Sequence, residues 1–170
     1  MAIDISIVEA LTEQESDRLF KWGEDIFGVS CLAMEWRPKR WHILLKEDGR
    51  PVSHVGVLEH QLSIGDKQLA IGGIGAVSTV PEAQGKGYAS QAMEYAHAFM
   101  REDLAADFGL LFCIEHMVKF YQRLGWRQLE DTVVIEQPSG QISAPFPALY
   151  LPLGKREWPS GPINLDSLPW

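Results

Sequence analysis

A glycine-rich segment, residues 84–90, constrains the fold of this chain more than any other feature. Gly85 and Gly87 lie between Pro81, which ends an apolar stretch because proline cannot donate to a strand ladder, and an amphipathic helix. Glycines let the backbone turn tightly, and the first N–H groups of a helix have no partner within it. With the helix dipole these donors form an anion site that suits a pyrophosphate. The segment therefore predicts a strand–turn–helix unit that binds a phosphorylated ligand, with Lys86 adding charge at the rim.

The segment differs from two better-known phosphate motifs. The Gly-Lys-Ser/Thr triplet of a P-loop is absent, and Ser90 stands where a dinucleotide fingerprint has its third glycine. The strand before the turn also belongs to a predicted meander rather than to a βαβ unit. The sequence therefore disfavours both nucleotide classes.

The periodicity of the remaining chain predicts a mixed sheet with helices on its faces. Residues 3–8 alternate apolar and polar side chains, and Thr12 with Glu15 forms a capping box that begins a helix. Turn signals at Asp48-Gly49 and Gly65-Asp66 join three strands into an antiparallel meander. The further predicted elements are strands at 42–47, 52–64 and 68–80, a helix at 87–103, a strand at 108–114, a helix at 117–124 and strands at 132–137 and 148–153, with 138–147 as a loop. The order β-α-βββ-α-β-α-ββ predicts an α/β or α+β fold.

Bulk composition limits the class of protein. A length of 170 residues suits a single domain over 1–170, in which the Pro- and Trp-containing residues 154–170 form an extended tail. The net charge of −8 argues against nucleic acid and suits a cationic small molecule. No apolar run reaches the roughly 20 residues of a membrane span. We see no secretory signal, and two cysteines without metal-ligand spacing predict reduced thiols, a cytoplasmic location and no metal; a monomer and a homodimer both stay open.

The glycine-rich segment resembles the Gln/Arg-x-x-Gly-x-Gly/Ala signature of the GCN5-related N-acetyltransferases (GNAT family). Gln84, Gly87 and Ala89 fill its defined positions, the strand end at 77–82 resembles the usual lead-in, and 120–126 resembles the second hallmark. The resemblance covers about residues 3–153. It implies a mostly antiparallel sheet of six to seven strands and acetyl-CoA as cofactor. The implied cofactor-binding residues are Val77, Ser78 and Thr79, through the main chain of the strand, and Gln84, Gly85, Lys86, Gly87, Tyr88, Ala89 and Ser90.

The same resemblance implies direct acetyl transfer to an amine. Tyr121 resembles the tyrosine that protonates the CoA thiolate in many members. The glutamate that members often carry on the third strand is absent, because the register puts Gly75 there. Glu59 is the candidate general base, with His60, Glu35, a water relay and the carboxylate of Trp170 as alternatives. We interpret Cys113 as a core residue rather than a nucleophile.

A second resemblance concerns the acceptor. Residues 26–36 are similar to the acceptor loop of the aminoglycoside 2′-N-acetyltransferases, which also end in a tryptophan tail. On that likeness Ser30, Glu35, Trp36 and Trp170 bind substrate. Ser30, Gly75 and Leu168 stand where acidic residues are expected. An acceptor site with fewer carboxylates suits an amino sugar with fewer cationic centres, such as kasugamycin, and hence antibiotic resistance.

Other functions remain open from the sequence. One is acetylation of a protein N-terminus, a lysine or another small amine. A second is a non-catalytic acyl-CoA-binding module that acts as a sensor. A Pro-rich tail over the acceptor site argues against an open peptide groove, and Tyr121 argues against a sensor.

Overall fold

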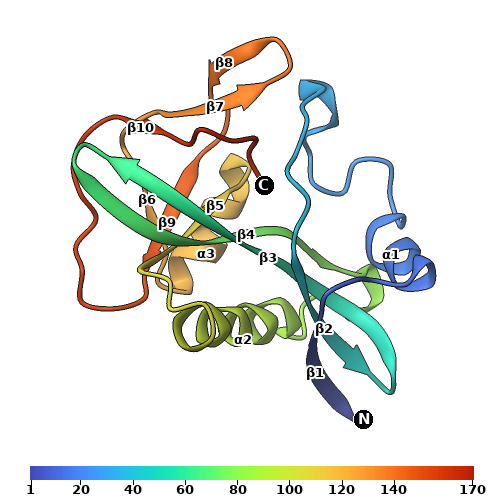
Figure 1. Cartoon of the computed structure of the whole chain (residues 1–170). Coiled ribbons are helices and arrows are strands. Elements are labelled where there is room, and N and C mark those ends of the chain that lie inside the picture. Colours follow the sequence, from blue (N-terminus) through green and yellow to red (C-terminus); the bar gives the residue numbers. More distant parts are fainter.

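A twisted sheet divides the protein into two layers, as the computed structural model of residues 1–170 shows (Figure 1). The strands are β1 Ile3–Val8, β2 Trp41–Glu47, β3 Arg50–Ile64, β4 Lys67–Thr79, β5 Phe108–Phe112, β6 Arg127–Gln128, β7 Val133–Gln137, β8 Gly140–Ser143, β9 Ala148–Pro152 and β10 Ile163–Asn164. The helices are α1 Glu13–Phe20, α2 Tyr88–Glu102 and α3 Val118–Arg123, with 3₁₀ turns at Ser30–Leu32, Pro81–Ala83 and Glu115–Met117. None of these helices has both the length and the apolar character that a membrane span requires.

Seven strands form the main sheet in the order β1-β2-β3-β4-β5-β9-β6. All neighbouring pairs are antiparallel except β4 and β5, which run parallel because α2 connects them. The predicted meander is the β2-β3-β4 part of this order. The expectation of a mixed, mostly antiparallel sheet with helices is therefore confirmed.

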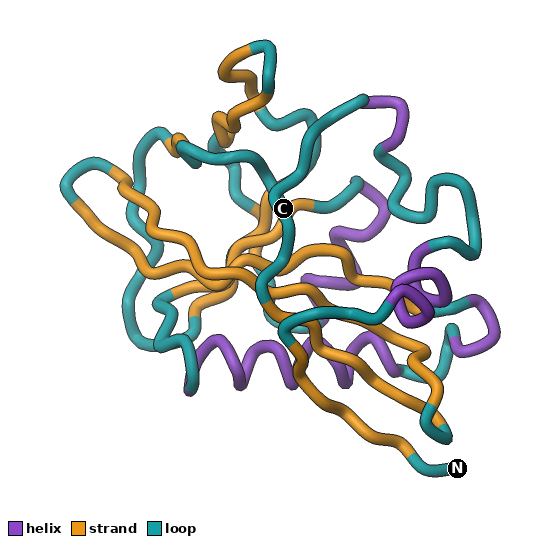
Figure 2. The backbone as a smooth tube through the Cα atoms, turned by 45° about the vertical axis from the view of Figure 1, so that its right-hand side comes forward, coloured by secondary structure: helices purple, strands orange, loops and turns teal.

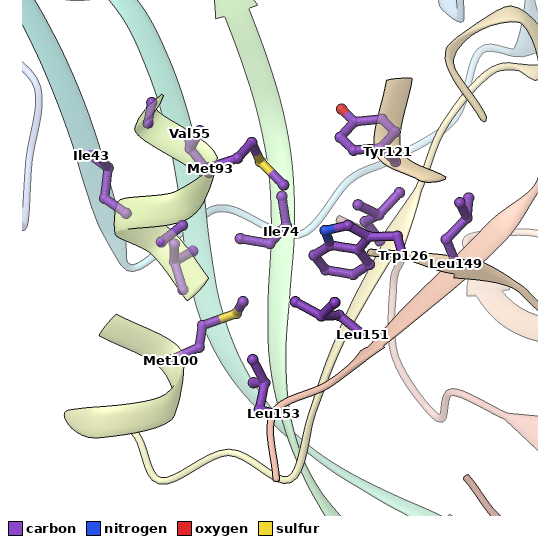
Figure 3. Close-up of a cluster of buried hydrophobic side chains, with 14 of the residues drawn as sticks. Ile43, Val55, Ile74, Met93, Met100, Tyr121, Trp126, Leu149, Leu151 and Leu153 are labelled. Atoms are coloured by element: carbon purple, nitrogen blue, oxygen red, sulfur yellow. The ribbon is translucent and has the colours of Figure 1, made fainter. Parts of the chain in front are cut away.

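The core lies between α2 and one face of the sheet (Figure 3). The apolar stripe of α2 presents Met93 and Met100 to Ile43, Val55 and Ile74, and all five side chains are buried. Fully burying a side chain of this kind contributes about 1.5–3 kcal/mol. The packing fixes the position of α2, and hence of the glycine-rich turn at its N-terminus, relative to β4.

The strands β4 and β5 separate partway along their length. They pair only over Ile71–Ile74 and Phe108–Leu111, whereas β4 continues to Thr79 and stays paired with β3. Beyond Ile74 the edge of β4 that faces β5 has no strand partner. The backbone there is irregular as well, since the β3–β4 register shifts between His54 and Gly56 and Ala76 has a φ of 50°. The divergence opens a gap in the middle of the sheet.

Residues 154–170 return across the sheet face opposite α2. β10 pairs in parallel with β7 in a small sheet of order β10-β7-β8, and Leu165 and Trp170 are buried. The indole N–H of Trp170 donates to the carbonyl of Leu110 over 3.0 Å. Both backbone views place the C-terminal end against the middle of the sheet, far from the N-terminus (Figure 2).

The structure corrects several predicted boundaries. The segment 138–147, predicted as a loop, contains β8, whose residues are all exposed and so lack an alternating hydrophobic pattern. β7 belongs to the small sheet rather than to the main one. α1 ends at Phe20, and residues 26–27 follow an irregular stretch that contains Gly23. β6 and β10 were not predicted because two residues are too few to show a period.

Candidate active site

A cavity of about 400 Å³ occupies the gap between β4 and β5. It is lined by strand residues from β4 and β5, by side chains of α3 and the turn before it, and by aromatic residues from the 26–36 loop, the β8–β9 connection and the tail. The lining consists of Ile26, Phe27, Val29, Trp36, Lys39, Ile74, Gly75, Ala76, Val77, Leu111, Phe112, Cys113, Ile114, His116, Met117, Tyr121, Phe146 and Trp170. No aspartate or glutamate side chain is among them. The cavity is therefore an apolar passage through the sheet with a few polar groups.

Tyr121 lines this cavity from α3. Its ring packs against Phe120 and Trp126 at the edge of the core, and Figure 3 shows the hydroxyl directed away from Trp126. The hydroxyl makes no hydrogen bond to the protein, so its proton is free for a ligand. Burial, and secondarily Cys113, raises the pKa of Tyr121 well above its usual range. The phenol therefore stays protonated at any working pH.

Cys113 shows how a thiolate would behave in the same cavity. Burial, reinforced by Glu115, raises the pKa of the Cys113 thiol to about 12. A nucleophilic cysteine has a lowered pKa instead, so Cys113 is poorly suited to attack a substrate. A thiolate released from another molecule at this place would likewise be strongly basic, and would take a proton from a nearby donor.

The glycine-rich turn forms an open cradle of N–H groups at the start of α2. Gly85 and Gly87 have φ values of 76° and 78°, and a Cβ at either would meet no atom within 4 Å. Gly87 is the N-cap of α2 and offers no side chain, and the first helical N–H with an acceptor is that of Gln91. The N–H groups of 85–90 are thus unpaired and available to an anion. The side chain of Gln84 braces the turn by donating to the carbonyl of Thr79 over 3.0 Å.

Two further residues of the turn are held by Glu47 at the end of β2. The Lys86 ammonium lies 3.2 Å from its carboxylate, and the Tyr88 hydroxyl donates to the same group over 2.6 Å. The hydroxyl, and then Lys86, lowers the pKa of Glu47. The three side chains fix the outer wall of the cradle, while Ala89 and Ser90 follow on the first turn of α2.

The three strand residues predicted to bind a cofactor lie at the unpaired end of β4. Val77 lines the cavity. The Ser78 side chain points to the other face, where its hydroxyl donates to the carbonyl of Leu19 in α1 over 2.7 Å. The Thr79 hydroxyl pairs with that of Ser53 at 2.9 Å. What these residues offer a ligand is therefore the main chain of the free strand edge.

Aromatic side chains form the wall of the cavity on the tail side. Trp36 stacks on Phe146 with ring centroids 5.4 Å apart, and Trp170 packs edge-on against Phe112 at 5.7 Å. The N–H of Arg37 donates to the carbonyl of Pro169 over 2.7 Å, which ties the 26–36 loop to the tail. Trp36 and Trp170 therefore meet at one cavity, although they are 134 positions apart in the sequence.

Gly75 is a glycine because other groups fill the space beside it. A Cβ there would lie 2.8 Å from the carboxyl carbon of Trp170 and would overlap Cε of Lys39. Gly56, its partner across the β3–β4 ladder, makes room for the stem of the same lysine. Lys39 Nζ donates to the Arg37 carbonyl over 2.9 Å, and burial, with Arg37, lowers the pKa of Lys39 to about 8. The Lys39 amine and the carboxyl group of Trp170, an alternative base from the sequence, therefore both lie beside Gly75, where a glutamate was expected.

The structure does not bring the remaining candidates to this cavity. Glu59 lines a separate hollow with His60, and its carboxylate faces Arg40 at 3.5 Å. Glu35 is bound through its main chain to the Gln137 amide. Ser30 lines an adjoining hollow, beside the acidic Glu24 and Asp25, that shares Trp36 with the main cavity.

Sequence reasoning missed Lys39 and Phe146. Lys39 lies in a stretch without periodicity, and Phe146 lies in a segment predicted as a loop. The available signal was that two glycines, Gly56 and Gly75, pair across neighbouring strands, which leaves room for a side chain from elsewhere to cross them. A single sequence gives no indication of which distant residue fills such a space.

Comparison with known proteins agrees with this geometry. Residues 8–129 match the family described as Acetyltransferase (GNAT) domain. Among solved structures, Escherichia coli ElaA has a TM-score of 0.59 and 16% identity, covering 88% of this chain and 99% of that one. A Brucella melitensis GNAT family acetyltransferase in complex with acetyl-CoA has a TM-score of 0.55 and 18% identity, with 94% of each chain covered.

The likeness to longer proteins is partial. A GCN5-related N-acetyltransferase from Kribbella flavida has a TM-score of 0.51 and 18% identity over 74% of this chain, which spans 34% of that protein's length. At such identities these structures support the fold alone. No curated protein matches the chain by sequence.

Proposed function

Because the chain belongs to the GNAT acetyltransferase family, we propose that it moves the acetyl group of acetyl-CoA onto the primary amine of a small acceptor held against Trp36 and Trp170. As a member of this family the chain is an N-acetyltransferase, and acetyl-CoA is its donor. The observation that supports the proposal is convergence: the free edge of β4, Tyr121 and the aromatic wall all line one cavity.

The donor is proposed to lie along the gap in the sheet. Its pyrophosphate accepts from the N–H groups of the turn, from Gly85 to Ser90, at the positive end of α2. Its pantetheine arm pairs with the free main chain of β4 from Val77 to Thr79. The thioester then reaches the middle of the sheet, where Tyr121 and Lys39 line the cavity.

Tyr121 is proposed to protonate the leaving group. The acceptor nitrogen attacks the thioester carbonyl, the C–S bond breaks, and the sulfur carries the charge. Because the cavity raises the basicity of a thiolate, as at Cys113, the sulfur can take the Tyr121 proton. Positioned acids of this kind contribute about 10²–10⁴-fold.

Lys39 is proposed to take the acceptor's proton, in place of Glu59. The Glu59 carboxylate lies in another hollow, whereas Lys39 lies beside Gly75 and lines the cavity with Tyr121. A lysine with a pKa of about 8 is partly neutral near physiological pH and can accept a proton from an ammonium group. In the neutral state it keeps its hydrogen bond to the Arg37 carbonyl.

The acceptor is proposed to be an amino sugar of the aminoglycoside type with few cationic centres, such as kasugamycin, whose acetylation would give resistance. The aromatic wall formed by Trp36, Phe146 and Trp170 suits the flat faces of sugar rings. A cavity that contains Lys39 and no carboxylate side chain is unsuited to several ammonium groups at once. Glu24 and Asp25 lie at the adjoining hollow and can receive one.

An amine panel tests the proposal. CoA release would be measured with kasugamycin, a polycationic aminoglycoside, a peptide with free N-terminus and lysine, and a simple aromatic amine. Turnover of kasugamycin with little turnover of the polycation supports the amino sugar. Preference for the peptide or the aromatic amine supports acetyltransferase activity but refutes the amino sugar as acceptor. Acetyl-CoA binding without any turnover supports the sensor alternative.

A further inference from the structure

A buried histidine on β3 contacts the main chain of β4 at a residue that lines the cavity. His54 has no exposed surface, and its Nδ1 lies 2.6 Å from the carbonyl oxygen of Ala76. A carbonyl only accepts, so Nδ1 carries the hydrogen. Nε2 lies 2.9 Å from Nδ1 of His42, and the Phe20 ring forms a T-shaped pair with the imidazole, with ring centroids 4.9 Å apart. The ring is thereby fixed in orientation and tautomer, and His42 donates to it.

Ala76 is the irregular residue of β4. It sits where the β3–β4 register shifts, and its φ of 50° is left-handed, which costs about 1–2 kcal/mol for a residue with a Cβ. The bulge takes the Ala76 carbonyl out of the regular ladder, and His54 supplies its donor. The histidine therefore stabilises a backbone conformation that the residue type disfavours.

The next N–H along the chain is turned by the same peptide. No peptide bond in the chain is cis, and in a planar trans peptide the N–H points opposite to the C=O. Since the Ala76 carbonyl points at His54, the N–H of Val77 points away from it. Ala76 and Val77 both line the cavity, and β5 has already separated from this edge. A hydrogen bond to the carbonyl side of a peptide also strengthens its N–H as a donor.

We propose that His54 is a positioning residue for acetyl transfer: through the Ala76 carbonyl it aims and polarises the Val77 N–H at the thioester oxygen of acetyl-CoA. Negative charge builds on that oxygen as the acceptor nitrogen adds to the carbonyl carbon. A preorganised backbone donor there stabilises the charge without moving. The inference rests on acetyl-CoA as donor and is independent of which amine is the acceptor.

Two ligands separate this role from a general structural one. Acetyl-CoA has the carbonyl oxygen, whereas S-ethyl-CoA, a thioether of similar size, lacks it. Calorimetry would measure both dissociation constants for the wild type, His54→Ala and His54→Asn. An asparagine amide places a donor near the position of Nδ1.

We expect the wild type to prefer acetyl-CoA, His54→Ala to lose most of that preference while binding S-ethyl-CoA as before, and His54→Asn to regain much of it. With the acceptor found, kcat of His54→Ala should fall about 10–100-fold, less than the 10²–10³-fold typical of removing a donor outright, with KM for the amine little changed. The carbonyl stretch of bound ¹³C-acetyl-CoA should shift to higher frequency in His54→Ala.

The inference is overturned if folded His54→Ala keeps the wild-type preference for acetyl-CoA. It is equally overturned if His54→Ala weakens both ligands alike, which is the result of a merely structural role. If His54→Ala does not fold, His54→Asn decides, because a preference near that of the wild type supports a donor role and its loss excludes one. No acceptor enters the measurement, so failure of the amine panel is a separate result.

Discussion

At the scale of single residues the site combines groups that burial has changed in opposite directions. Burial keeps Tyr121 protonated by raising its pKa, and lowers the pKa of Lys39 to about 8. An acid that holds its proton and an amine that gives one up suit the two ends of an acetyl transfer. The two side chains line the same cavity from opposite faces of the sheet, α3 on one and the tail face on the other.

Removing the Tyr121 hydroxyl tests the acid. Tyr121→Phe should lower kcat by about 10²–10⁴-fold and leave the dissociation constant of acetyl-CoA within about twofold, because only the transferable proton is lost. Tyr95→Phe, on the exposed face of α2, is the matched control and should behave as wild type. A Tyr121→Phe enzyme with wild-type kcat would exclude the hydroxyl from the mechanism.

Replacing the Lys39 amine tests the base. Lys39→Met keeps an apolar stem over Gly56 and removes the titrating group. A base works when neutral, so the wild-type kcat should rise with pH through about 8, where Lys39 loses its proton. Lys39→Met should have a lower kcat without that rise. The same pH profile in both proteins would assign the base elsewhere.

At the scale of elements, the unpaired N–H groups of the turn before α2 could be predicted from sequence. Glycines between a strand and a helix leave N–H groups unpaired whatever surrounds them, so the pattern predicts the chemistry. The acceptor side could not be predicted in the same way. Lys39 reaches Gly75 across two strands, and its position depends on the path of an irregular segment and of the tail. Glu59, by contrast, is a candidate because it lies on the strand next to that of Gly75, but β3 carries it to another hollow.

A negative charge in the turn should abolish donor binding. Gly87→Asp places a carboxylate among the free N–H groups and a Cβ on a left-handed backbone. Calorimetry should show at least a tenfold weaker acetyl-CoA affinity, about 1.4 kcal/mol. Gly65→Asp, at a φ of 59° in the β3–β4 hairpin, carries similar strain and the same charge change at the other end of β3 and should bind normally. Equal affinities in the two variants would refute the site.

The tail forms part of the aromatic wall against which we propose that the acceptor binds, so shortening it should affect the amine. Deleting residues 168–170 removes Trp170 and the Pro169 carbonyl that accepts from Arg37. KM for the amine should rise far more than KM for acetyl-CoA. Trp170→Ala should do the same to a smaller extent, while Trp158→Ala, which removes a tail tryptophan that packs on Phe108 and Tyr150, should leave the amine KM unchanged. If both tryptophan variants act alike, the tail is only structural.

At the scale of the whole molecule the topology was predictable and its edges were not. Alternation in β1–β4 and the stripe of α2 depend on burial against one core, which leaves a period in the sequence. β8 is exposed throughout, and β6 and β10 are stabilised by neighbours rather than by their own pattern. Burial lowers the pKa of four histidines, His42, His54, His60 and His97, which also leave no such pattern, yet they couple the stability of the whole molecule to pH.

Acid should therefore destabilise the protein below about pH 6.5. Burial lowers the pKa of His54 to about 3 and that of His97 to about 4, whereas both have values near 6.5 when unfolded. Between about pH 6.5 and 4 the unfolded chain binds protons that the native state does not, so the free energy of unfolding falls with falling pH, by up to about 1.4 kcal/mol per pH unit for each histidine. This stability is fully present above about pH 6.5.

His97 offers a clean test, because its Nε2 accepts from the Trp126 indole over 3.0 Å and glutamine can accept in its place without titrating. Urea unfolding at pH 7.5 and pH 5 should show a smaller loss of stability for His97→Gln than for the wild type. Exposed His116→Gln should lose as much as the wild type. A His97→Gln protein with the full wild-type loss would show that the imidazole takes up its proton equally well in the folded state, and that the charged ring finds a partner or a path to water beside Trp126.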